Sequence, residues 1–338
     1  MGSVNIKQLA KELNLSISTV SRALRDSYEI SAETKERVRN MAKELNYQPN
    51  PYATSLRKQK SKTIAVIIPE IANNFFSLAI NGIEEVAQQK GYHVLIYLTH
   101  EDYQKEISIA NHLASGRVDG ILASISSETN DIGHLEELNK KKIPVVFFDR
   151  VSEIIQTTKV TTDDFKSGYK ATEHLIKRSC KKIAYLSISK HLSIASKRML
   201  GYLQALKDYD LPVEEKFILN TSNNNEENYS LIRKLLTSSG RPDGIFASVE
   251  KLAISTYHIC KELNLNIPKD VKIISFSNLE TASLLNPSLT TITQPAFHIG
   301  REAATVLFKA LDKNISNLAN NNIVLDSELV ERDSTADH

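Results

Sequence analysis

The first 45 residues place apolar side chains at the spacing of three short α-helices. Each expected helix follows a side chain that can cap it: Asn5 before Ile6 to about Leu13, Ser16 before Ile17 to about Leu24, and Ser31 before Ala32 to about Leu45. Asn14 and Leu15 would form a tight turn between the first two. Helices this short are marginal alone, so we expect them to pack together as one small helical domain.

Prolines and basic residues then interrupt the pattern. Pro49 and Pro51 break any continuing helix, while Asn50 and Pro51 suit the start of a short helical stretch from Tyr52 to Arg57. A basic polar segment, 58–62, follows. We therefore expect a helix-turn-helix headpiece at 1–48, a hinge helix and linker at 49–62, and a body at 63–338.

In the body, apolar runs of strand length alternate with helical segments. The expected strands are 63–68, 93–98, 120–123, 145–148, 183–187, 244–247 and 271–276, and the expected helices are 76–90, 102–115, 164–177, 194–208 and 252–263. Buried strands separated by helices indicate parallel α/β sheets. The elements form two series, so we expect two lobes, about 63–161 plus 294–318 and about 162–293 plus 319–338.

The expected fold class is therefore α/β, with a small all-α head and a two-lobed, doubly wound parallel-sheet body. Open parallel sheets bind ligands beyond the carboxyl ends of their strands. A cleft between the lobes is the expected ligand site.

Charge and composition indicate the kind of partner that the head binds and the compartment in which the protein works. Residues 1–62 contain 12 Lys/Arg and 6 Asp/Glu, a net charge of +6, which leaves −4 for the remainder. A basic head on a mildly acidic body suggests that the head meets a polyanion. No apolar run approaches the roughly 18 residues of a membrane helix, and no secretory signal is visible. Cys180 and Cys260 suggest reduced thiols in a cytoplasmic protein.

The segment from Ile6 to Leu24 has the pattern of a helix-turn-helix. Ala10 is small where two helices would cross, and Leu15 and Val20 are apolar where the second helix would pack. The side chains left to face a major groove are Ile17, Ser18, Ser21 and Arg22. The short hydroxyl donors suited to phosphate oxygens are Ser16, Thr19 and Ser21.

These residues resemble the head of the LacI/GalR family of bacterial repressors. The resemblance rests on the run 18–22, on 45–50, on Leu56 within 53–57 and on 329–335, so it spans essentially the whole chain. It implies a lactose-repressor-like transcription regulator that binds a palindromic double-stranded DNA operator as a homodimer. It also implies allosteric control by a small ligand, a sugar or sugar derivative.

The resemblance assigns roles on DNA. Ile17, Ser18 and Arg22 would read bases, Arg22 by a bidentate contact with guanine and Ile17 by apolar contact with a thymine methyl. The segment 50–57 would become a hinge helix only on DNA. Leu56 would then wedge into the minor groove, with Ala53 beside it.

The resemblance also makes the body similar to periplasmic sugar-binding proteins. The expected effector contacts are Asn74, Phe75, Phe76, Asp149, Arg150, Arg198, Ser277 and Gln294. The Asp149-Arg150 pair resembles pentose-binding relatives. Two positions depart from the family pattern: Val249 stands where many relatives have asparagine, and Ser277 where they often have aspartate. These departures leave room for a phosphorylated or modified sugar, a less polar ligand, or a site that has lost small-molecule binding.

Other functional classes fit less well. None of the motifs G-x-G-x-x-G, G-x-x-x-x-G-K-[ST], G-x-S-x-G or H-E-x-x-H occurs, so we expect no enzyme activity, cofactor or metal. A solute-binding protein would need a signal peptide and no helix-turn-helix. Control of the same DNA-binding role by a protein partner, or by no ligand, remains an alternative. The sequence after Arg332 lacks a heptad leucine tail, which favours a dimer over a tetramer.

Overall fold

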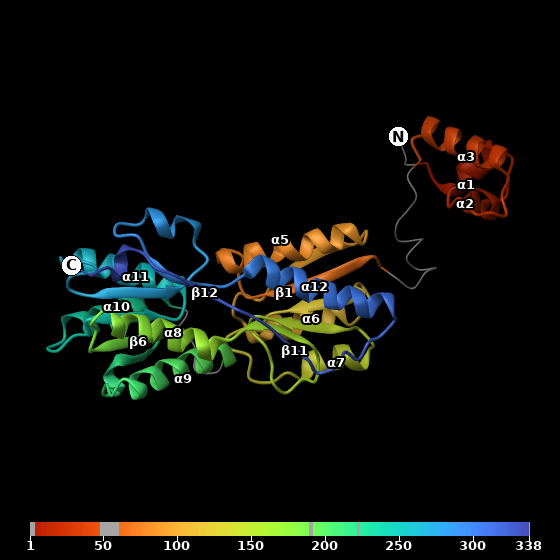
Figure 1. Ribbon diagram of the computed structural model, residues 1–338. Coiled ribbons are helices and arrows are strands. Elements are labelled where there is room, and N and C mark those ends of the chain that lie inside the picture. The colour runs from red at the N-terminus through yellow and green to blue at the C-terminus, as the bar shows by residue number, and fades with distance from the viewer. Residues whose placement is uncertain (1–3, 48–60, 189–191, 222–223, 338) are drawn as a thin grey trace. The chain divides into compact units, whose positions relative to one another are not determined.

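The computed structural model describes residues 4–47, 61–188, 192–221 and 224–337 (Figure 1). The chain divides into two compact units, 1–61 and 62–338. We refer to them as the head and the body. The division falls within the basic segment 58–62.

The head is a bundle of three short helices: α1 (Ile6–Glu12), α2 (Ile17–Ala23) and α3 (Ala32–Glu44). The three predicted caps are confirmed, because the side chains of Asn5, Ser16 and Ser31 each accept a hydrogen bond from the backbone N–H three residues later. Asn14 turns the chain between α1 and α2 with φ at 52°. The apolar faces meet in a small core of Leu9, Ala10, Leu13, Val20, Ala23, Val38 and Ala42.

The first lobe of the body holds a six-stranded sheet in the order β11-β5-β4-β3-β1-β2, in which all neighbouring strands are parallel. Its strands are β1 (Thr63–Ile68), β2 (His93–Leu98), β3 (Gly120–Ala123), β4 (Val145–Phe148), β5 (Lys159–Thr162) and β11 (Asn322–Leu325). Its helices are α5 (Asn74–Gln89), α6 (Tyr103–Leu113), α7 (Gly133–Lys140) and α12 (Ala296–Asp312).

Alternate residues of β1 show how the first sheet is covered. Ile64, Val66 and Ile68 share an apolar cluster with residues of α5 and α12, whereas Ala65 and Ile67 share one with residues of α6 and α7. Side chains of a strand alternate between faces, so helices cover both faces, as a doubly wound sheet requires.

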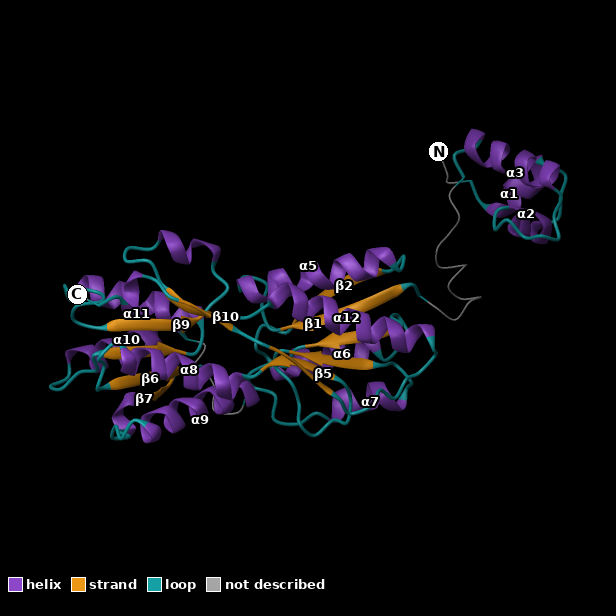
Figure 2. Ribbon diagram, in the orientation of Figure 1, coloured by secondary structure: helices purple, strands orange, loops and turns teal. Residues whose placement is uncertain are grey.

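The second lobe repeats the plan with strand order β12-β10-β9-β8-β6-β7 (Figure 2). Its strands are β6 (Ile183–Ser187), β7 (Ile218–Asn220), β8 (Gly244–Ala247), β9 (Lys272–Phe276), β10 (Thr290–Thr293) and β12 (Glu328–Val330), and only the pair β10–β12 is antiparallel among the described strands. Its helices are α8 (Asp164–Lys177), α9 (Ser193–Asp208), α10 (Asn225–Thr237) and α11 (Glu250–Glu262). Three short 3-10 turns lie at Glu215–Phe217, Glu280–Leu284 and Asp333–Thr335.

The chain crosses between the lobes three times, from β5 to α8, from β10 to α12 and from β11 to β12. We expected residues from 319 onward to belong to the second lobe, and this boundary is wrong. Asn322–Leu325 pair in parallel with Lys159–Thr162 at the edge of the first sheet. The last crossing therefore lies between Leu325 and Glu328. The physical reason is that β5 at the edge of the first sheet offers the backbone groups of β11 a full ladder of hydrogen-bond partners.

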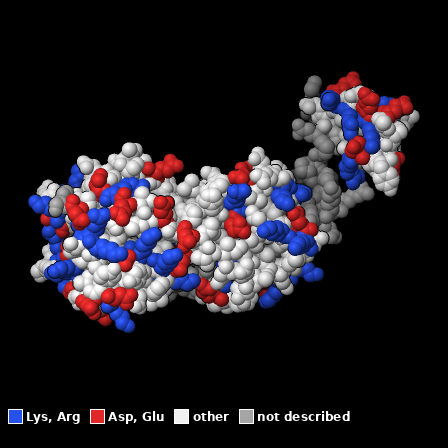
Figure 3. Space-filling view, viewed as in Figure 1, with Lys and Arg blue, Asp and Glu red and all other residues white. Residues whose placement is uncertain are grey.

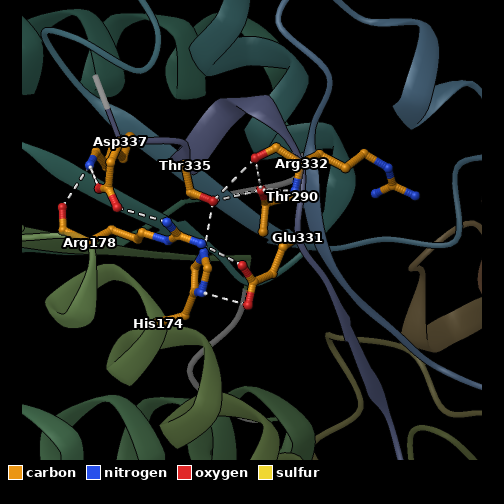
Figure 4. Close-up of polar contacts among 8 residues, drawn as sticks. His174, Arg178, Thr290, Glu331, Arg332, Thr335 and Asp337 are labelled. Carbon is orange, nitrogen blue, oxygen red and sulfur yellow. Dashed lines mark hydrogen bonds and ion pairs between the residues drawn. The ribbon is translucent and has the colours of Figure 1, made fainter.

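The C-terminal segment is tied to the second lobe by a network of ion pairs and hydrogen bonds (Figure 4). The guanidinium of Arg178, the C-cap of α8, contacts Glu331 at 2.6 Å and Asp337 at 2.8 Å. His174, one turn earlier, lies 2.8 Å from the Thr335 hydroxyl, and burial lowers the pKa of this imidazole. The segment after β12 is thereby fixed against α8.

Candidate functional site

A cleft between the two lobes of the body holds about 400 Å³ of space, including its open side. It is lined by Asn73, Phe75, Phe76, Asp149, Arg150, Ile194, Arg198, Ser248, Val249, Glu250, Phe276, Ser277, Asn278 and Gln294. Most of these residues directly follow the carboxyl ends of β4, β8, β9 and β10. The topology therefore brings polar loop residues of both sheets together, as expected for open parallel sheets.

Arg198 on α9 forms the polar floor of the cleft from the second lobe. Its Nε donates to Asp164 Oδ1 at 2.7 Å, and its Nη1 donates to the Ser248 carbonyl at 2.7 Å. Its guanidinium lies 3.6 Å from the centroid of the Phe276 ring, a cation–π distance. Arg198 is 2% exposed, so the arginine is fully desolvated and held from three sides.

Gln294, which directly follows β10, links this floor to the first lobe. Its Nε2 donates to Asp149 Oδ1 at 3.2 Å and to Thr162 Oγ1 at 3.1 Å, and its Oε1 accepts from Arg198 Nη2 at 3.4 Å. Thr162 ends β5, where the chain first crosses between the lobes, and Gln294 lies on the second crossing. Part of this hydrogen-bond network therefore lies on the segments that cross between the two lobes.

Two buried carboxyl groups flank Arg198. Burial raises the pKa of Asp149, and the positive charges of Arg198 and Arg150 oppose this rise. Burial also raises the pKa of Asp164 to about 6, with Arg198 opposing and Asp149 adding to the rise. Asp149 has φ at 58°, in the left-handed region that aspartate tolerates better than most residues. Carboxyl groups beside guanidinium groups suit adjacent hydroxyls of a ligand.

Arg150 is held from the side of the first lobe. Its Nη1 donates to both carboxylate oxygens of Glu101, at 2.8 and 3.0 Å, and its guanidinium lies 5.7 Å from the Phe76 ring centroid. Burial works against the charge of Glu101, but Arg150 and the Ser127 N–H hold the pKa of this carboxyl below its usual value. Arg150 also borders an adjoining cavity, whose lining includes Lys251.

An acidic residue that the sequence reasoning missed lies beside Ser277. The Ser277 hydroxyl donates to Glu250 Oε2 at 2.8 Å, and Glu250 is the first residue of α11. The cleft thus has a carboxylate in contact with position 277, although serine stands there. An acid directly after an expected strand and before an expected helix is the pattern that could have indicated Glu250.

The structure brings together all of the predicted effector residues except Asn74. The Asn74 side chain donates to the Asn278 carbonyl at 3.5 Å. Its neighbour Asn73 lines the cleft instead and caps α5 by accepting from the Phe75 N–H at 3.0 Å. Phe75 and Phe76 border the cleft but lie mainly in the core, 6% and 1% exposed. The sequence reasoning also missed Ile194, Ser248, Phe276 and Asn278 among the lining residues.

On the head, the predicted DNA contacts on α2 differ in exposure. Ile17, Ser18 and Arg22 are exposed, whereas Thr19 and Ser21 are half-buried. The Ser16 hydroxyl accepts from the Thr19 N–H as the helix cap. Ala53 and Leu56 lie outside the described residues.

Among the residues that the structure describes, neither the head nor the body shows a metal site or a membrane span. Within the described ranges, no group of three or more His, Cys, Asp and Glu side chains could hold a metal ion. None of the helices described there is long and apolar enough to cross a membrane.

Comparisons with known proteins agree with this arrangement. Residues 5–50 match the model of bacterial regulatory proteins of the lacI family, and 61–326 match that of periplasmic binding proteins and the sugar-binding domain of the LacI family. Catabolite control protein A of Priestia megaterium is 30% identical over 92% of this chain and 93% of its own length.

Two solved structures are similar over most of their length. The lac repressor dimer bound to operator and the anti-inducer ONPF is 21% identical, with a TM-score of 0.85 over 99% of both chains. A LacI family transcriptional regulator from Enterococcus faecium with bound ribose is 28% identical, with a TM-score of 0.72 over 81% of this chain and 98% of that one. Since family models account for both units and a relative matches nearly end to end, this chain belongs to the LacI family of bacterial transcription regulators, and not to a class of enzymes.

Proposed function

We propose that this regulator is a cytoplasmic repressor that binds a palindromic operator as a homodimer, and that a sugar or sugar derivative in the cleft controls its affinity for DNA. The α2 helix would read the major groove. The cleft would hold the effector between Asp149, Arg150, Arg198 and Gln294.

The buried network around Gln294 carries this proposal. It joins Asp149 of the first lobe to Arg198 of the second, and it includes Thr162 on a crossing segment. A ligand whose hydroxyls take over some of these hydrogen bonds would favour one arrangement of the lobes over another. Its effect on DNA binding would equal its difference in affinity for the two arrangements.

The lining indicates the class of ligand. Charged and amide groups at the floor suit hydroxyls, while Phe276, Val249 and Ile194 offer apolar surface. The ribose-bound relative supports a monosaccharide. On the side of the second lobe, Val249 offers apolar surface and Glu250 offers a carboxylate that can accept from a ligand hydroxyl.

A thermal-shift screen of the purified full-length chain tests the effector. The probes are pentoses, hexoses, uronic acids, their phosphates and disaccharides. A ligand at about 100 times its Kd stabilises the body by roughly 2.7 kcal/mol, which gives a visible rise in Tm.

Asp149→Asn should abolish the response of Tm to the active sugar, because it removes the negative charge and replaces one of the two acceptor oxygens by an NH₂ donor with little change of shape. Asp210→Asn is the matched control, since Asp210 also has a left-handed φ, 54°, but is exposed outside the cleft. DNA binding without sugar should survive in both variants. A folded wild-type chain that responds to no sugar would contradict the effector proposal and favour control by a protein partner.

A further inference from the structure

The head contains an ion pair that involves the residue expected to read a base. Arg22 Nη1 on α2 lies 2.7 Å from Glu29 Oε2 in the turn before α3. The side chains are 51% and 45% exposed. An exposed ion pair of this kind contributes little to stability, so its position invites a functional explanation.

The surroundings make Glu29 distinctive. Asp26, the nearby acid, is in contact with Lys35 at 3.1 Å and Arg39 at 2.9 Å, which hold the pKa of Asp26 below its usual value. The guanidinium of Arg25 donates to the backbone carbonyl and to the hydroxyl of Ser21. Glu29 instead places a carboxylate on the exposed arginine of α2. Near DNA phosphates such a carboxylate is repelled, unless a specific contact compensates.

We propose that Glu29 is a specificity-determining residue that positions the guanidinium of Arg22 for one base. This inference rests on the proposed base-reading role of Arg22. With Nη1 held by Glu29, the edge formed by Nε and Nη2 is left to meet the O6 and N7 acceptors of guanine. The carboxylate limits the rotamers of Arg22, so less conformational entropy is lost when that contact forms.

The same carboxylate acts against binding at wrong sequences. On random DNA, Arg22 finds no matching pair of acceptors, while the repulsion between Glu29 and the phosphates remains. Glu29 therefore lowers the affinity for random DNA more than the affinity for the operator. Glu29 therefore contributes to the ratio between the affinity for the operator and the affinity for random DNA, rather than to the overall affinity for DNA.

The test uses the full-length chain and two DNA probes. The first is a duplex selected by the wild-type protein from a library with a randomised core, and the second is a random-sequence duplex of the same length. Affinity is measured for both at several salt concentrations. Glu29→Gln keeps the shape of the side chain and removes its charge. Glu44→Gln removes the same charge at an exposed position at the end of α3 and is the matched control.

Glu29→Gln should raise affinity for random DNA and leave or lower affinity for the operator, so that the ratio of the two falls roughly three- to ten-fold. The salt dependence of binding to random DNA should become steeper. Repeating the selection with this variant should yield a broader base preference at one position in each half-site. Glu44→Gln should leave the ratio and the preference unchanged.

The variant Arg22→Met distinguishes a failure of the role proposed for Glu29 from a failure of the base-reading role of Arg22. If Arg22→Met lowers the ratio and Glu29→Gln has no further effect in its presence, the two residues act as a unit and the inference stands. If Arg22→Met lowers the ratio but Glu29→Gln alone does not, Glu29 contributes only general charge and the inference fails by itself. If Arg22→Met leaves the ratio unchanged, the base-reading role of Arg22 fails, and with it the basis for Glu29.

Discussion

Asp164 and Arg198 show how burial sets the chemistry of single residues in this cleft. Their side chains are each 3% exposed and meet at 2.7 Å. Breaking such a buried pair usually costs about 3–5 kcal/mol, whereas forming it stabilises the fold far less. The pair is better explained as a way of aiming the guanidinium than as a source of stability.

The raised pKa of Asp164 predicts a pH dependence of stability. Between its ordinary pKa of 3.8 and its folded value of about 6, the folded chain keeps a proton that the unfolded chain has lost. The free energy of unfolding therefore falls as pH rises through this window, by up to about 3 kcal/mol from this group. Asp164→Asn should flatten the curve between pH 4 and 7, as measured by urea unfolding. If variant and wild-type curves stay parallel, Asp164 is not the group responsible.

The sequence predicted the polar floor of the cleft better than its walls. Asp149, Arg150 and Arg198 were recognisable because charged residues stood just after a strand or inside a helix that matched a family pattern. Phe276 ends a buried strand and could not be told from a core residue by its position. Glu250 stands between an expected strand and an expected helix, but its contact with Ser277 could be seen only when the loops after β8 and β9 were placed side by side.

At the scale of elements, each lobe has a pair of helices that pack closely against each other at a glycine. A Cβ on Gly201 of α9 would lie 2.6 Å from the Tyr169 nitrogen and inside the contact distance of the Phe165 carbonyl, both on α8. In the first lobe, a Cβ on Gly300 of α12 would collide with the Ala79 carbonyl on α5. These glycines allow the backbones to touch.

Gly201→Ala should therefore destabilise the body by about 1–3 kcal/mol and lower its Tm by several degrees. It should also weaken the response to an effector, because it pushes α9, with Arg198, away from α8, with Asp164. Differential scanning fluorimetry with and without the active sugar measures both effects. Gly133→Ala is the control, since a Cβ there would meet nothing closer than 3.6 Å. An unchanged Tm in Gly201→Ala would show that the crossing can open freely.

Elements with clear caps or long apolar runs were mostly predictable, but α10 and α12 were not among the expected helices, although Asn224 caps α10 and α12 has 17 residues. The helices of the head and most strands of the body agree with expectation within a few residues. The pattern gave no indication of α7, whose N-cap Ile132 makes no side-chain hydrogen bond, or of the half-buried strand β7. Nor did it indicate β12, which has three residues and takes its place only through the ladder with β10.

At the scale of the molecule, the two parts of the chain differ in charge, because residues after 62 carry a net charge of only −4. Figure 3 shows Lys and Arg interspersed with Asp and Glu over the visible face. The excess of +6 over residues 1–62 is therefore the feature that would draw the chain to DNA.

The separate cores of head and body predict two unfolding transitions in calorimetry of the full chain. The head core consists of residues from its own three helices, and the body has four apolar clusters of its own. The sugar found in the screen should raise the body transition, and the selected operator duplex should raise the head transition. A single transition that both probes move together would contradict this independence.

The three crossings between the lobes also constrain the order in which a ribosome can complete the protein. The first lobe lacks α12 and β11 until nearly all of the second lobe has been synthesised. From Thr162 to Asp312 the ribosome adds about 150 residues, which takes on the order of ten seconds. Throughout that interval α5 already lies on one face of the first sheet, but the part of that face that later packs against Leu307 and Phe308 remains uncovered. The first lobe therefore completes its apolar core only after the second lobe has been synthesised, and until then it exposes apolar surface of the kind that chaperones bind.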